Sequence, residues 1–179
     1  WPYAQYTKVT DTPEIQEKPF LMKNDNGDYG VFVPSVRKNV SGVSWNSEGS
    51  EGEFIGLDKF YIAKPTDTAA KINEQISSGK NLILTPGIYD ISEPIRITNE
   101  NTVVLGLGYA TLKPTKGNQC MTVADVGGVK LAGILFDAGR TKSSVLLTVG
   151  VKDSKTSHED NPILLSDTFY RVGGADNTP

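Results

Sequence analysis

Asn81-Leu-Ile-Leu-Thr-Pro-Gly-Ile-Tyr89 is the first of four similar segments of nine residues, and this set decides the fold. The other three are Asn101-Thr-Val-Val-Leu-Gly-Leu-Gly-Tyr109, Gly127-Gly-Val-Lys-Leu-Ala-Gly-Ile-Leu135 and Asn161-Pro-Ile-Leu-Leu-Ser-Asp-Thr-Phe169. They begin 20, 26 and 34 residues apart, and the extra length lies in polar stretches such as 152–160. Repeats whose insertions are confined to one corner are typical of a solenoid. Stacked coils form a long face, along which an extended polymer can bind.

Positions within the segments predict which side chains face the core. The third and fifth positions are one strand period apart and almost wholly apolar, so both should point inward. They hold Ile83, Val103, Val129 and Ile163, and then Thr85, Leu105, Leu131 and Leu165. The sixth position predicts the bend between sheets because its residues are small or turn-forming: Pro86, Gly106, Ala132 and Ser166. The ninth position indicates either core packing or a platform for sugar rings, with Tyr89, Tyr109, Leu135 and Phe169.

Residues 1–59 contain no copy of the segment and predict a hairpin and loop region. Two short apolar runs, 17–22 and 29–34, flank Asn24-Asp-Asn-Gly-Asp28, whose Asn-Gly pair favours the tight turn of a β-hairpin. The acidic and amide side chains of this turn also suit a calcium loop, but the closing glutamate of such a loop is missing. The stretch 41–56 around Trp45 is rich in Gly, Ser and Glu and predicts a loop.

Residues 60–80 predict a strand and a short helix ahead of the coils. Thr66 or Asp67 suits the N-cap position, and Gly79 suits the C-terminal stop. The apolar face of this helix consists of Ala69, Ile72 and Ile76. Such a helix can cover the open end of a solenoid, where core side chains and unpaired backbone would otherwise meet water. The predicted fold is therefore all-β, with one capping helix and with coils over 81–179.

The composition excludes several classes of partner. Net charge is −3 and the sequence pI is about 5.2, so no basic surface favours nucleic acid or anionic lipid. No apolar run reaches the roughly 18 residues of a membrane span, and no charged-then-apolar leader opens the chain. The single cysteine, Cys120, cannot form an internal disulfide and is expected to be buried. The single histidine, His158, is expected in a solvated loop.

Asp67-Thr-Ala-Ala-Lys-Ile-Asn73, the segment that ends at Tyr89, and Pro94-Ile-Arg-Ile97 together carry a family resemblance. They resemble the start of the right-handed parallel β-helix of the pectate-lyase-like superfamily, and the likeness extends over about 60–174. More narrowly, Val129-Lys-Leu-Ala-Gly-Ile-Leu-Phe-Asp-Ala-Gly139 is similar to a stretch of large secreted bacterial and fungal proteins of this superfamily. Those relatives are often described as glycoside hydrolases.

The resemblance implies an extracellular carbohydrate-active protein, with a glycoside hydrolase acting on a polysaccharide as the favoured activity. It implies no cofactor. Related β-helices have many more coils than four, so the chain is expected to be the N-terminal part of a longer, secreted protein. Its expected partners are a glycan and the remainder of the parent β-helix. A glycan-binding or adhesin-like module without catalysis is one alternative, and a polysaccharide lyase is another.

Glycoside hydrolysis uses two carboxyl groups, and stacked coils can supply them because equal positions lie about 4.8 Å apart. Asp137 and Arg171 share the eleventh position of the last two segments, so they form either a structural ion pair or an active-site pair. Asp167 falls in a turn, where it either binds nearby amides or acts on substrate. We take Asp137, Asp167 and Arg171 as the candidate catalytic residues. The candidate substrate-binding residues are Trp45 and Tyr170.

Other chemistries fit less well. A lyase needs a base, for which Lys130 and Arg140 are candidates, but no clustered acidic ligands for a metal ion accompany them. A serine nucleophile would depend on His158, and the chain has no Gly-x-Ser-x-Gly turn. The sequence therefore predicts no metal site and no catalytic triad.

Overall fold

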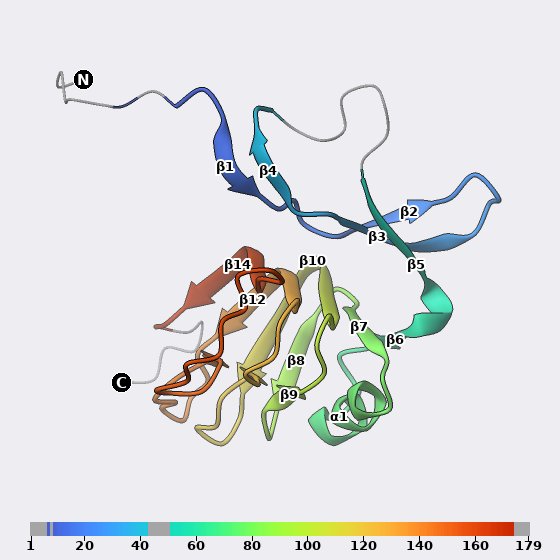
Figure 1. Ribbon diagram of the computed structural model, residues 1–179. Helices are drawn as coiled ribbons and strands as arrows, with labels where there is room; N and C mark the ends of the chain where they lie inside the picture. The colour runs from blue at the N-terminus through green and yellow to red at the C-terminus, as the bar shows by residue number, and fades with distance from the viewer. Residues whose placement is uncertain (1–6, 8, 43–50, 174–179) are drawn as a thin grey trace, which may run out of the picture.

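The structure is a computed structural model that describes residues 7, 9–42 and 51–173 (Figure 1). Among these residues the protein is mostly β, and its larger part consists of two parallel sheets. The first has the order β14-β12-β10-β7-β6, with β8 also paired to β10, and the second has the order β13-β11-β9. The strands of the first sheet are β6 (Phe60–Ala63), β7 (Asn81–Leu84), β8 (Ile88–Ile91), β10 (Val103–Pro114), β12 (Lys130–Asp137) and β14 (Leu164–Arg171). Those of the second are β9 (Ile95–Ile97), β11 (Met121–Val123) and β13 (Leu147–Val149).

The N-terminal residues form two antiparallel sheets, which lie on one side of the parallel sheets in Figure 1. The predicted hairpin is confirmed, since β2 (Phe20–Lys23) pairs with β3 (Tyr29–Pro34). β3 also pairs with β5 (Gly52–Gly56), whereas the sequence predicted a loop throughout 41–56. β1 (Thr12–Ile15) pairs with β4 (Arg37–Val40). A 3₁₀ turn, η1 (Leu57–Lys59), leads from β5 into β6.

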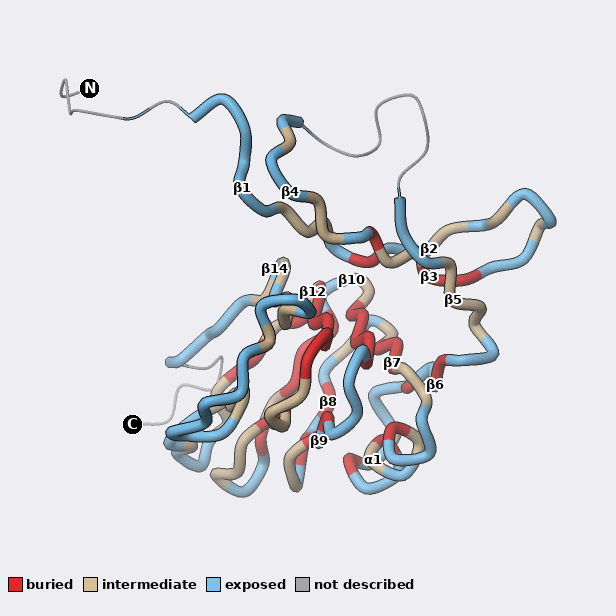
Figure 2. Tube along the Cα trace, viewed as in Figure 1, coloured by how far each residue is buried: buried red, intermediate tan, exposed pale blue. Residues whose placement is uncertain are grey.

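Two separate apolar cores hold these layers together, and Figure 2 shows the buried residues gathered in the parallel strands and the helix. The larger core lies inside the parallel sheets and includes Leu82, Val104, Leu131 and Phe136, each 0% exposed. The smaller core lies between the parallel strands and the N-terminal sheet. It consists of Val31, Phe60, Ile83, Val103, Leu105 and Ala132, with Val33, Ile55, Leu57 and Leu107 packed against it. The central parallel strands are therefore buried on both faces.

This double burial explains an error in the predicted ladders. Ile83, Val103 and Leu105 belong to the smaller, outer core and not to the larger core inside the parallel sheets. The register differs too, because Ile83 pairs with Leu105 and not with Val103, and Val103 pairs with Lys130. A strand buried on both faces is a continuous apolar run, so its alternation carries no signal of which side faces inward. The alignment of the last two segments is confirmed, since Leu131 pairs with Leu165.

The predicted helix is confirmed as α1 (Ala69–Ser77), and its buried face is Ala69, Ile72 and Ile76. Its N-cap is Thr68, which accepts a hydrogen bond from the Lys71 amide at 3.2 Å, and not Thr66 or Asp67. Asp67 instead accepts hydrogen bonds from the Tyr61 hydroxyl and the Lys64 amide, both at 2.9 Å. The helix packs against β9 and β6, at the end of the parallel sheets opposite β14.

The parallel strands turn a corner that positions the candidate site. β10 has an irregular register between Leu105 and Ala110, and Tyr109 there has a φ of 63°. Gly133 in β12 and Asp167 in β14 have φ values of 70° and 49°. The bend predicted at Ala132 and Ser166 therefore falls one residue later, because those two residues pair regularly in the sheet.

Candidate functional site

Asp137 and Arg171 are stacked neighbours, as their shared position predicts. The Arg171 guanidinium donates from Nε to Oδ1 of Asp137 at 2.8 Å, and from Nη2 to Oδ2. The Asp137 side chain is 3% exposed and that of Arg171 is 47% exposed. A buried carboxylate with a bidentate arginine is well compensated, because both oxygens accept charge-assisted hydrogen bonds. This geometry is that of an ion pair which fixes the end of β12 to the end of β14.

Asp167 lies at the corner of β14, and its partner comes from the N-terminal region. The Lys18 ammonium donates to Oδ2 of Asp167, and both side chains are about half exposed. The predicted alternative was a bond from Asp167 to nearby backbone amides. The pair instead fixes the segment between β1 and β2 to the last strand of the parallel sheet. Both residues line a cavity of about 390 Å³ on the outer side of β10, β12 and β14.

Tyr170 belongs to a row of large side chains that agrees with the predicted ninth-position ladder at Tyr89 and lies at other residues in the later strands. Tyr89, Leu112, Phe136 and Tyr170 pair in successive strands. The Tyr170 ring stacks on the Phe136 ring at a centroid distance of 5.2 Å and an angle of 11°. Tyr170 is nevertheless 46% exposed, since no strand within the described ranges covers that side of β14. Trp45, the other candidate for substrate binding, lies outside the described residues.

The predicted ninth-position ladder is correct only for Tyr89, which is fully buried. Tyr109 and Phe169 point away from the core and are exposed, and Leu135 is half-buried. The irregular register of β10 shifts Leu112 into the interior in place of Tyr109. Side chains that the sequence assigned to one ladder therefore lie on two faces of the sheet.

The lyase candidates are both engaged in the structure. Lys130 is buried and donates to the Pro162 carbonyl at 3.0 Å, and burial lowers the pKa of its ammonium group. Arg140 lines a separate cavity of about 240 Å³ with Asp90 and Lys113. Cys120 is buried as predicted, and burial raises the pKa of its thiol to about 12.

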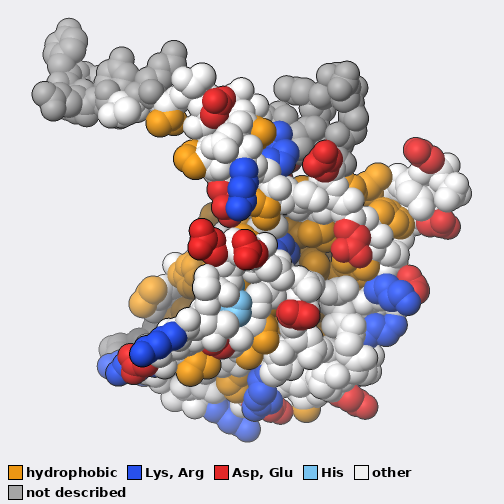
Figure 3. Space-filling model, viewed as in Figure 1, with side chains coloured by type: hydrophobic (Ala, Val, Ile, Leu, Met, Phe, Trp, Pro, Cys, Tyr) orange, Lys and Arg blue, Asp and Glu red, His pale blue; other side chains and the backbone are white. Residues whose placement is uncertain are grey.

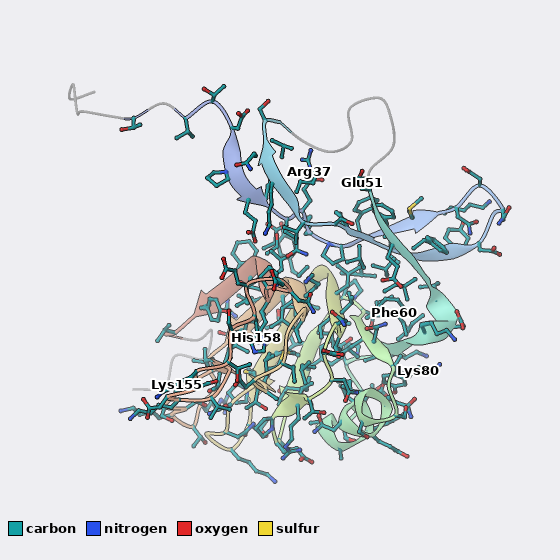
Figure 4. All side chains as sticks on the ribbon, viewed as in Figure 1. Arg37, Glu51, Phe60, Lys80, Lys155 and His158 are labelled. Carbon is teal, nitrogen blue, oxygen red and sulfur yellow. The ribbon has the colours of Figure 1, made fainter. Side chains whose placement is uncertain are left out.

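A second polar cluster was not predicted. His158 Nε2 lies 2.9 Å from Oδ1 of Asp125, and the Ser154 hydroxyl donates to Oδ2 of the same carboxylate. The Ser154 hydrogen bond, followed by that of His158, lowers the pKa of Asp125 below its usual value. Figure 4 labels His158, which was expected in solvent and is half-buried here. The pair joins residues 33 positions apart, which no local pattern signals.

The cluster borders a cavity of about 520 Å³, whose other lining residues include Asn99, Glu100 and Asn161. No group of three or more His, Cys, Asp or Glu side chains in the described part of the chain could hold a metal ion. Acidic and basic side chains are mixed over the face drawn in Figure 3. No helix within the described ranges is long and apolar enough to cross a membrane.

Residues 60–178 match the family described as the LAM55 pectate lyase-like domain. The chain belongs to this family. The predicted resemblance to pectate-lyase-like proteins is thereby confirmed. The match begins at β6 and includes every strand of the parallel sheets.

Relatives of known name support the LAM55 assignment. The exo-beta-1,3-glucanase of Streptomyces sp. strain SirexAA-E is 46% identical over 175 residues, which are 98% of this chain and 29% of that enzyme. The structure of sacteLam55A from Streptomyces sp. SirexAA-E has a TM-score of 0.92 at 46% identity, over 98% of this chain and 32% of that one. A variant of sacteLam55A in complex with glucose gives a TM-score of 0.88 at 48% identity, over 92% and 30% of the two chains. This chain thus spans less than a third of the length of these relatives.

Proposed function

We propose that this LAM55 chain is part of a secreted glycoside hydrolase that acts on β-1,3-glucan. The observation that carries this proposal is 46% identity, over 98% of the chain, to an exo-beta-1,3-glucanase. The structure adds a solvent-facing carboxylate, Asp167, beside a cavity, which suits contact with a neutral sugar polymer. Because the chain spans less than a third of that relative, the activity belongs to the whole parent protein.

The finer form of the fold is part of the same proposal. We infer that the parallel sheets are coils of a right-handed parallel β-helix. The support is that β7 with β8, β10, β12 and β14 are successive returns of the chain to one sheet, with β9, β11 and β13 between them in the other. The inward positions Leu165 and Tyr170 are partly exposed on β14, so a further coil from the remainder of the parent would bury them.

The roles of the candidate residues follow from their exposure. Asp167 is accessible to substrate. Asp137 is buried and paired with Arg171, so its role is to hold the corner in shape and not to touch the substrate. A glycoside hydrolase needs two carboxyl groups, so Asp167 would work with a second one supplied by the remainder of the parent. Trp45 remains a predicted substrate contact, whereas Tyr170, also a candidate from the sequence, is assigned here to the interface with the further coil.

The test uses the protein that the complete gene encodes, incubated with linear β-1,3-glucan and, in parallel, with β-1,4-glucan and pectin. We expect glucose to be released from the β-1,3-linked polymer, with no unsaturated product. An unsaturated product would indicate a lyase, and no product from any glycan would leave a binding module. Asp167→Asn should lower kcat/KM at least about tenfold, or about 1.4 kcal/mol. Asp160→Asn, an exposed loop carboxylate, is the matched control.

A further inference from the structure

At the corner of the parallel sheet, one row of paired residues on the outer face, here called the stripe, has exposed apolar side chains at its two ends, while Thr111 within it is polar and buried. Ile88, Thr111, Leu135 and Phe169 pair in successive strands, so they lie side by side on the outer face. Ile88 is 57% exposed and Phe169 is 53% exposed. The alternate positions, Tyr89, Leu112 and Phe136, fill the interior. With strands roughly 4.8 Å apart, these four rungs extend for about 14 Å.

A groove adjoins this stripe. Its cavity of about 390 Å³ is lined by Lys18, Gly106, Gly108, Tyr109, Gly133, Ile134, Leu135, Asp167 and Phe169. Three glycines contribute to this lining, and at Gly106 no side chain fits, because a Cβ there would lie 2.2 Å from the Gly133 carbonyl oxygen. Two aromatic residues and a charge pair therefore line the same cavity as these glycines.

Tyr109 is unusual in both backbone and exposure. Its φ of 63° is unfavourable for an aromatic residue, and its side chain is 81% exposed. Core packing does not account for a ring that faces solvent. A strained, exposed aromatic residue beside a groove is characteristic of a binding site.

We propose that this groove is a subsite for a β-1,3-glucan chain, in which Tyr109 and Phe169 stack on sugar rings and the Lys18–Asp167 pair binds hydroxyl groups. The inference rests on the proposed function and names where its substrate lies. Sugar rings present apolar faces and polar edges, so they need both kinds of contact. Lys18 and Asp167 neutralise each other, which suits a neutral polymer better than an anionic one. Phe169 at one end of the stripe and Tyr109 both line the groove and come from different strands, which suits a ligand that spans more than one strand.

The test measures the affinity of the full-length protein for a linear hexasaccharide of β-1,3-linked glucose by calorimetry. Phe169→Ala and Tyr109→Gly should each raise Kd at least about tenfold, which corresponds to about 1.4 kcal/mol. Glycine suits the φ of residue 109, so Tyr109→Gly removes the ring while relieving backbone strain. Tyr109→Phe should keep Kd within about twofold because it keeps the ring. Tyr29→Ala, at an exposed tyrosine on β3, should also leave Kd unchanged.

The outcomes separate this subsite from the proposed function. An unchanged Kd in Tyr109→Gly and Phe169→Ala, or no binding by the wild type, overturns the subsite. A lower Tm with an unchanged Kd also overturns it and shows that another part of the parent covers the groove. If the protein binds the hexasaccharide through these rings but does not cleave glucan, the subsite stands and the hydrolase assignment fails. If both variants cleave glucan and bind the hexasaccharide as well as the wild type does, the hydrolase assignment stands and the subsite fails.

Discussion

At the scale of single residues, Gly133 shows how closely β10 and β12 approach each other at the corner. Its φ is +70°, and a Cβ there would lie 2.5 Å from the Gly106 carbonyl oxygen. Gly150 has a similar φ of +75° but no atom within 4 Å of its Cβ position. The two positions therefore share a backbone conformation but differ in the room that they leave for a side chain.

We expect Gly150→Ala to lower the free energy of unfolding by about 1 kcal/mol, through backbone strain alone. Gly133→Ala should lower it by at least about 1 kcal/mol more, because the methyl group meets a backbone atom that cannot move freely. Urea denaturation of both variants measures the difference. If both variants lost the same free energy of unfolding, β10 and β12 would be able to move apart at Gly133 at little cost.

Asp125 makes a pH-dependent contribution to stability. Hydrogen bonds from Ser154 and His158 lower its pKa in the folded state. The contribution is therefore complete above the unfolded pKa of about 3.9, and it is lost as pH falls through the lower folded value. Between pH 6 and pH 3, the Tm of Asp125→Asn should fall less than that of the wild type. Asp160→Asn is the control and should follow the wild type. If the Tm of Asp125→Asn fell with pH as steeply as that of the wild type, Asp125 would not contribute to the pH dependence of stability.

At the scale of elements, α1 protects the edge of a sheet as well as the core. The Asn73 amide donates to the Pro94 carbonyl at 2.9 Å, and its oxygen accepts from the Arg96 amide at 2.8 Å. These are backbone groups around β9, the edge strand of the second parallel sheet. A helix side chain thus replaces the missing neighbouring strand.

Asn73→Ala should lower the free energy of unfolding by about 1–3 kcal/mol, because it leaves these backbone groups without a partner. It should also speed hydrogen exchange at the Arg96 amide, which reports the edge directly. Glu74→Ala, at the next, exposed helix position, should change neither measurement. Unchanged exchange at Arg96 in Asn73→Ala would show that the helix covers the edge only by packing.

The helix, the hairpin and the parallel strands were predictable because each leaves a local pattern. The sequence could not predict which side chains of β7 and β10 point into the larger core. Both strands are buried on both sides, and their segments are apolar throughout: Leu82-Ile83-Leu84 and Val103-Val104-Leu105. At the start of β12, Lys130 interrupts the apolar run, and the predicted inward direction is correct for its two neighbours, Val129 and Leu131.

At the scale of the whole molecule, the site was predictable only where the repeat itself brings residues together. Asp137 and Arg171 share a position in the repeat, so their contact follows from the alignment. The contact of Lys18 with Asp167 joins β14 to a segment outside the repeat, and that of His158 with Asp125 joins the loops that follow β13 and β11. Their partners are fixed by the packing of a second layer and of a long loop, which leave no periodic signal.

The proposed continuation of the coils makes Tyr170 a test of the complete protein. In this chain Tyr170 packs on Phe136 from one side and is 46% exposed on the other. If a further coil covers β14, Tyr170→Ala in the full-length protein should lower the free energy of unfolding by about 3–5 kcal/mol, as in a core. In the 179-residue chain alone the loss should be about 1 kcal/mol, since one ring contact disappears and no enclosed cavity forms. Urea denaturation measures both. Tyr29→Ala, at an exposed position of β3 in the N-terminal sheet, should have the same small effect in each. An equal, small loss for Tyr170→Ala in both proteins would show that β14 is the true edge of the sheet.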